Sequence, residues 1–72
     1  MSAAEKATAA IAYEISRMPF SITPTPDNTF VRGMIELAEM SELVDRVAAN
    51  RYRAALDTKY QARLNHLKGV AA

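Results

Sequence analysis

The chain has 72 residues, no cysteine and one histidine; 50% of its residues are hydrophobic and 24% are charged. This composition is typical of a folded globular chain and is too apolar for a disordered one. Disulfides are excluded, and His66 alone cannot form a zinc site, which normally needs four ligands. A domain of this size buries only about 60% of its unfolded surface. We therefore expect one small domain, residues 1–72, that is stabilised by homodimerisation.

The amino terminus places Glu5 and Lys6 where a secretory signal would need an apolar run. No stretch approaches the roughly 18 apolar residues that a membrane span requires. We expect a cytoplasmic protein that does not bind membranes.

A first helix is predicted over residues 3–17. Ser2 followed by Glu5 fits a capping box, in which each side chain satisfies a backbone N–H at the start of a helix. Its apolar face is built mostly from alanine, which buries little area, so this helix must pack closely against something larger. Pro19 ends the helix, because the residue before a proline is pushed away from helical geometry.

An extended connector is predicted over residues 18–28, which contain three prolines. Phe20 and Ile22 are two residues apart, as on one side of an extended segment, and we expect at least one of them in the core. A proline-rich docking motif would need more of the polyproline pattern than Pro24 and Pro26 provide.

No proline interrupts the helical pattern after the connector, and Ser41 followed by Glu42 is an acceptable helix start. We predict helices over residues 29–40 and 41–68, with one long kinked helix as the alternative. The predicted fold is all-α: a helical hairpin or three-helix arrangement in which the first helix folds back on the others.

One apolar stripe of these helices is the candidate self-association face. Its members recur at helical spacing, and methionine could add an adaptable contact surface. They are Phe30, Met34, Leu37, Val44 and Tyr52. Gly33, early in the same segment, costs about 1 kcal/mol relative to alanine, so either it permits close helix packing or it is simply tolerated.

Charge is segregated along the chain. Residues 1–45 hold seven acids and three bases, whereas residues 46–72 hold six bases and one acid. A basic helix with interleaved tyrosines can contact phosphates or an acidic protein. Oppositely charged halves could equally serve antiparallel pairing of two chains, or simple solvation. The candidate contacts to nucleic acid or an acidic partner are Arg46, Arg51, Arg53, Lys59 and Arg63.

Two local patterns also occur in this region. Glu42 and Arg46 are four apart in the order that favours a helical ion pair. Residues 36–56 could form a helix-turn-helix with the small residue Ala38, but the usual turn glycine and short polar turn are missing.

Enzymatic function is not expected. The acids Glu36, Glu39, Glu42 and Asp45 step by three and wind around a helix instead of converging. Arg63, not an acid, precedes His66 at the spacing of a di-iron motif, and a glycine-rich phosphate loop is missing. No catalytic, cofactor-binding or metal-binding residue is predicted.

The functional hypothesis is a small regulatory protein that self-associates and binds a protein partner, with exposed positions such as Met40 in contact with it. The alternative is a nucleic-acid-binding accessory or transcription-modulating protein that uses the basic carboxyl-terminal helix.

Overall fold

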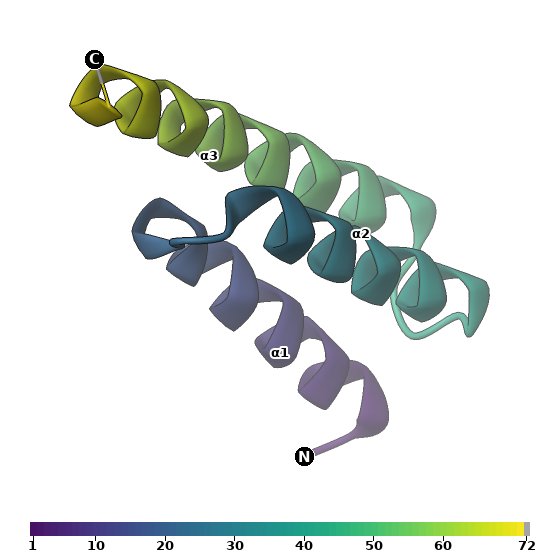
Figure 1. Ribbon diagram of the computed structural model, residues 1–72. Coiled ribbons are helices and arrows are strands. Elements are labelled where there is room, and N and C mark those ends of the chain that lie inside the picture. Colours follow the sequence, from purple (N-terminus) through teal and green to yellow (C-terminus); the bar gives the residue numbers. More distant parts are fainter. Residues whose placement is uncertain (72) are drawn as a thin grey trace.

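The computed structural model describes residues 1–71, which form three α-helices (Figure 1). α1 spans Ala3–Arg17, α2 spans Pro24–Met40 and α3 spans Arg46–Ala71, and a single 3-10 turn, η1, covers Met18–Phe20. Each helix runs opposite to the one before it, so the two chain ends lie at opposite ends of the molecule. The expectation of an all-helical chain is confirmed for this part of the sequence.

The first helix begins at the predicted capping box. Ser2 Oγ accepts from the backbone N–H of Glu5 at 3.1 Å, and Glu5 Oε1 accepts from the backbone N–H of Ser2 at 3.0 Å. At the other end the backbone N–H of Met18 still donates to Ile15, after which Pro19 lies in η1. Both ends of α1 therefore follow from local sequence chemistry.

The connector is shorter than predicted, because α2 begins at Pro24 instead of near Thr29. Proline fits the first turn of a helix, where its missing N–H would have no partner in any case. The segment is held by the carboxylate of Asp27, which accepts from Ser21 Oγ at 2.5 Å and from Thr23 Oγ1 at 3.3 Å. The prediction of an extended segment over residues 18–28 was wrong for most of its length, because residues 18–20 form η1 and residues 24–28 belong to α2.

The expectation that Phe20 or Ile22 would enter the core was also wrong. The two side chains are 80% and 88% exposed. The tight η1 turn directs Met18 and Ser21 inward instead, and both are buried. The short connection leaves no room for an extended strand that could place a second apolar side chain inside.

α2 ends in a Schellman motif. The backbone N–H of Leu43 donates to the Ala38 carbonyl at 2.9 Å, and the N–H of Glu42 donates to the Glu39 carbonyl at 3.0 Å. Glu42 takes the left-handed position, with φ of 61°, which glycine usually fills. The chain therefore turns directly after Met40, although the left-handed position holds a glutamate and not the usual glycine.

α3 begins at Arg46, later than the predicted start at Ser41. Asp45 caps it: its Oδ1 accepts from the backbone N–H of Ala48 at 2.7 Å, and its carbonyl accepts from Ala49. The helix continues through Gly69 to Ala71, beyond the predicted end at Lys68. In Figure 1, α3 runs back along α2 as a helical hairpin, unlike the steep crossing of a helix-turn-helix.

The core lies between the three helices and contains only aliphatic side chains and methionine. α2 contributes side chains from one of its faces. The other core side chains come from α1, η1, α3 and the turn between α2 and α3. The residues of this hydrophobic cluster are Ile11, Ile15, Met18, Val31, Ile35, Ala38, Val44, Ala49 and Leu56.

Two polar contacts tie α3 to the beginning of α2. Arg63 Nε donates to the Ser21 carbonyl at 2.7 Å. The hydroxyls of Tyr60 and Thr25 lie 2.9 Å apart and share a hydrogen bond. These contacts hold α3 against the chain where it passes from η1 into α2.

The small core predicts a sharp contrast between two isoleucines. Ile35 is 0% exposed and Ile22 is 88% exposed. Truncation of a buried isoleucine to alanine costs about 2–5 kcal/mol, and a core of this size rarely supplies more than about 3–5 kcal/mol. Ile35→Ala should therefore abolish cooperative unfolding, measured by thermal circular dichroism, whereas Ile22→Ala should melt like the unmodified chain. A cooperative, unshifted transition in Ile35→Ala would contradict this core.

Candidate interaction surfaces

α2 carries two apolar faces, and the core uses only one of them. Val31, Ile35 and Ala38 point inward and are buried. The other face is solvent-exposed and follows a 4-3-4-3 spacing along the sequence. We call it the outer stripe; it consists of Pro26, Phe30, Gly33, Leu37 and Met40.

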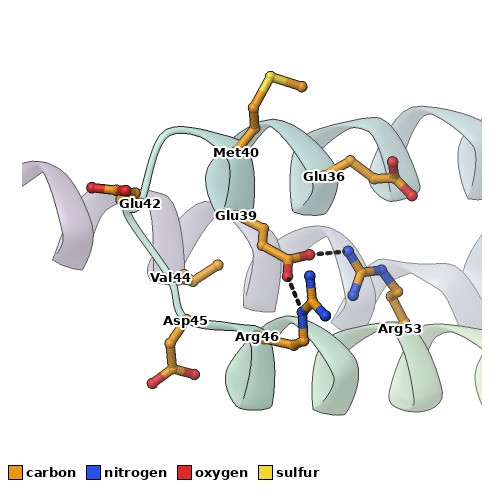
Figure 2. A pocket seen from close by; sticks show the side chains of 8 residues that line it. All are labelled: Glu36, Glu39, Met40, Glu42, Val44, Asp45, Arg46 and Arg53. Carbon is orange, nitrogen blue, oxygen red and sulfur yellow. Dashed lines mark hydrogen bonds and ion pairs between the residues drawn. The ribbon is translucent and has the colours of Figure 1, made fainter.

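The side chains of the outer stripe are largely free of contacts within the chain. Phe30 and Leu37 are each 62% exposed, and Met40 is 78% exposed. Figure 2 shows Met40 pointing away from α3, whereas the neighbouring Glu39 points toward it. Exposed apolar residues at this spacing form a continuous seam, as in helices that pack against another helix.

The candidate self-association face predicted from the sequence divides into two groups. Phe30 and Leu37 belong to the outer stripe, and Met34 is half-buried at its edge. Val44 is 9% exposed and lies in the core, against which Tyr52 packs. The chain turns between Met40 and Arg46, so one helical stripe cannot extend from Phe30 to Tyr52.

A shallow apolar groove borders the outer stripe where α1 meets α2. Its α1 wall contains Ala7, Ala10 and Ile11, and Met34 and Leu37 line the α2 side. Because α1 presents mainly alanine here, the groove has little polar surface. The groove widens the apolar area beside Leu37.

The basic candidates do not gather on one surface. Arg53 and Arg46 both bind the carboxylate of Glu39, the latter at 3.3 Å from Nε to Oε2 (Figure 2). Arg63 donates to a backbone carbonyl of the connector. Arg51 is exposed, and Lys59 is half-buried beside Phe20. Three of the five cations therefore support the fold of their own chain.

The cluster around Glu39 joins the two helices of the hairpin. Hydrogen bonding from Arg53 lowers the pKa of Glu39, burial opposes this shift, and the positive charges of Arg53 and Arg46 lower it further. The predicted pairing of Arg46 with Glu42 was wrong. Glu42 lies in the turn before α3, so the two residues do not share a helix.

The segregation of charge along the sequence is partly used within one chain. Glu39 of the acidic half binds two arginines of the basic half. A pair with the opposite arrangement, in which Arg32 of the acidic half approaches Asp57 of the basic half at 3.7 Å, joins the same two helices. The ion pairs link α2 to α3 in a fixed register. Pairing between chains is not needed to satisfy them.

A second surface combines an aromatic ring with cations at the η1 end of α3. Phe20 and Pro19 form one wall of a hollow, and Lys59, Arg63 and His66 line the other. Ile22, also exposed, follows Phe20 in the chain. The sequence indicated Lys59 and Arg63 but not the exposed aromatic ring beside them, because the connector was expected to fold inward.

Within residues 1–71, no three His, Asp or Glu side chains lie close enough together to hold a metal ion. Over the same range, no helix combines the length and the apolar character that crossing a membrane requires.

No protein family, curated protein or solved structure matches this chain.

The Glu39 cluster predicts a pH dependence of stability. Because the pKa of Glu39 is lower in the folded chain than its ordinary value of 4.5, its contribution is present above that value and is lost as pH falls through the folded pKa. Glu39→Gln should melt at a lower temperature than the unmodified chain at neutral pH, and the difference should shrink in acid. The backbone and side chain of Ser2 also lower the pKa of Glu5. The pH dependence of the melting temperature of Glu5→Gln can therefore be compared with that of Glu39→Gln, since Glu5 caps α1 and lies outside the Glu39 cluster. A constant difference between Glu39→Gln and the unmodified chain at all pH values would contradict this role.

Proposed function

We propose that this chain is a small, cytoplasmic, non-enzymatic interaction protein that associates with a second copy through the outer stripe and regulates a protein partner. The observation that carries the proposal is the exposure of Phe30, Leu37 and Met40 in one seam on α2. A monomer gains nothing from three large apolar side chains in water. Exposed apolar patches of this kind commonly mark protein interfaces.

The chemistry of the polar residues supports a binding role over catalysis. Glu39 is occupied by two arginines, and His66 is exposed near the end of α3. Glu36, Glu42 and Asp45 surround the same hollow as Glu39, but their side chains point in different directions (Figure 2). This arrangement lacks the positioned acid and base that proton-transfer chemistry requires.

Light scattering over a concentration series tests the association. The mass should rise from 7.9 kDa toward that of a dimer, and Leu37→Lys should weaken association about tenfold or more, since an apolar contact is replaced by a buried charge. Val47→Lys is the matched control, because Val47 is 61% exposed but lies on α3, outside the outer stripe. Circular dichroism checks that both variants stay folded. A chain that is monomeric at every concentration, or a Leu37→Lys variant that associates normally, would contradict the proposal.

A nucleic-acid-binding role is the alternative, and it is favoured by the exposed Phe20 beside Lys59. Aromatic stacking with adjacent cations is a common way to hold single-stranded nucleic acid. One observation argues against a nucleic-acid-binding role: Arg46, Arg53 and Arg63 already have partners within the chain.

A gel shift with single-stranded and duplex DNA separates the two functions. If the alternative holds, Phe20→Ala and Lys59→Ala should each weaken a complex that dissolves as salt rises, while Leu37→Lys leaves it unchanged. The absence of any complex at low salt would exclude this alternative.

A further inference from the structure

The ion pairs between α2 and α3 leave charges of opposite sign unpaired toward the two ends of the helical hairpin. Three arginines are satisfied within the hairpin by Glu39 and Asp57. Among residues 1–71, no ion pair involves Glu42 or Asp45, in the turn after α2, or Lys59, which lies on α3 beside η1. Because α3 runs back along α2, these acids and this cation lie toward opposite ends of a molecule 44 Å long (Figure 1).

The negative end is the exposed turn that follows α2. We call Met40, Glu42 and Asp45 the acidic turn, and all three residues are exposed. Figure 2 shows Met40 pointing away from α3, and Glu42 and Asp45 pointing away from the arginines that bind Glu39. Those arginines do not cancel the charge, because four acids and two bases line the surface beside the turn. The acidic turn therefore offers two carboxylates and one flexible apolar side chain.

The positive end is the hollow between η1 and α3. We call its residues Phe20, Lys59 and Arg63 the basic hollow; its two cations are four residues apart and lie on one face of α3. Within residues 1–71, no acid lines it. The contact of Arg63 with the Ser21 carbonyl uses one of five guanidinium N–H donors, so the side chain is held in place with donors to spare. Two half-buried cations favour an anion here, and the ring beside them favours an apolar group.

The two surfaces complement each other in charge and in apolar content, and one chain carries both. We propose that the acidic turn of one copy docks in the basic hollow of the next, head to tail. Glu42 then lies beside Lys59 and Arg63. Met40 packs against the ring of Phe20, a contact that the methionine sulfur favours. This contact goes beyond the self-association proposed above, since it leaves the rest of the outer stripe uncovered.

A head-to-tail contact repeats along a row of copies. Each chain offers its acidic turn and its basic hollow toward opposite ends, so the interface is heterologous and does not close as a two-fold dimer does. At low salt and high concentration the mass should therefore exceed that of two chains, and the excess should vanish as salt screens the charges. Association through the apolar outer stripe would stop at two chains and persist at high salt, so the two contacts can be measured separately.

Mixing two charge-reversal variants tests the head-to-tail contact. Both also carry Leu37→Ser, which removes the apolar contact of the outer stripe without adding a charge. Glu42→Lys changes the acidic turn and Lys59→Glu changes the basic hollow. Each variant alone should associate about tenfold more weakly or worse in light scattering at low salt, because like charges then face each other. The equimolar mixture should associate again, because the intact turn of one variant meets the intact hollow of the other.

Two further variants separate the basic hollow from the rest of α3. Arg51→Glu makes the same change of charge as Lys59→Glu, at an exposed position outside the hollow, and it should leave association unchanged. Phe20→Ser changes the hollow without changing its charge and should weaken association. Because Phe20 is 80% exposed, this variant should remain folded, which circular dichroism checks.

Three results would each overturn the head-to-tail contact. They are a Leu37→Ser chain that stays monomeric at low salt, a Lys59→Glu variant that associates as well as its Leu37→Ser parent, and a mixture that does not recover. None of them bears on the outer stripe, which is judged by the salt-resistant mass of the unmodified chain. If single-stranded DNA binds through Phe20 and Lys59 while the chains do not associate, the hollow belongs to nucleic acid and the contact is likewise overturned.

Discussion

Everything in this fold depends on α2 packing with its Val31–Ile35–Ala38 face against both other helices. The core is small and aliphatic, and each neighbour meets α2 through a short turn. α1 contributes Ile11 and Ile15 to the core, and α3 is held by ion pairs at Glu39 as well as by burial of Leu56. A helix that organises the fold with one face is free to offer its other face to another molecule.

Much of the architecture follows from local sequence chemistry. The capping box at Ser2 and the proline after Met18 predict both ends of α1, because each acts on the backbone directly beside it. The ends of α2 and α3 are harder to predict. Pro24 can begin a helix or interrupt one, and Glu42 adopts a left-handed conformation that sequence rules assign to glycine. The end of α2 at Met40 agrees with the break predicted at Ser41, whereas the turn over residues 41–45 depends on the hydrogen bonds to the Ala38 and Glu39 carbonyls.

The candidate surface was found only in part, for a related reason. α2 has two apolar stripes, and helical spacing alone cannot tell which one faces inward. The sequence pointed to Phe30 and Leu37, which are exposed, and overlooked Val31 and Ile35, which form the core. The predicted stripe also continued past Met40 to Val44 and Tyr52. Because the chain turns between Met40 and Arg46, these two residues lie at the core and not on the exposed face of α2. The cations were proposed as one group of contacts, but Arg46, Arg53 and Arg63 bind groups of their own chain, because their partners depend on which helices lie side by side.

The short connections between the helices also affect how fast the chain can fold. α1 reaches α2 through η1 and residues 21–23, and α2 reaches α3 through residues 41–45, so helices that are neighbours in sequence come together by closing small loops. Chains dominated by such local contacts fold in microseconds to milliseconds. A newly made copy would therefore bury its core within that time, and the proposed self-association would begin from folded monomers.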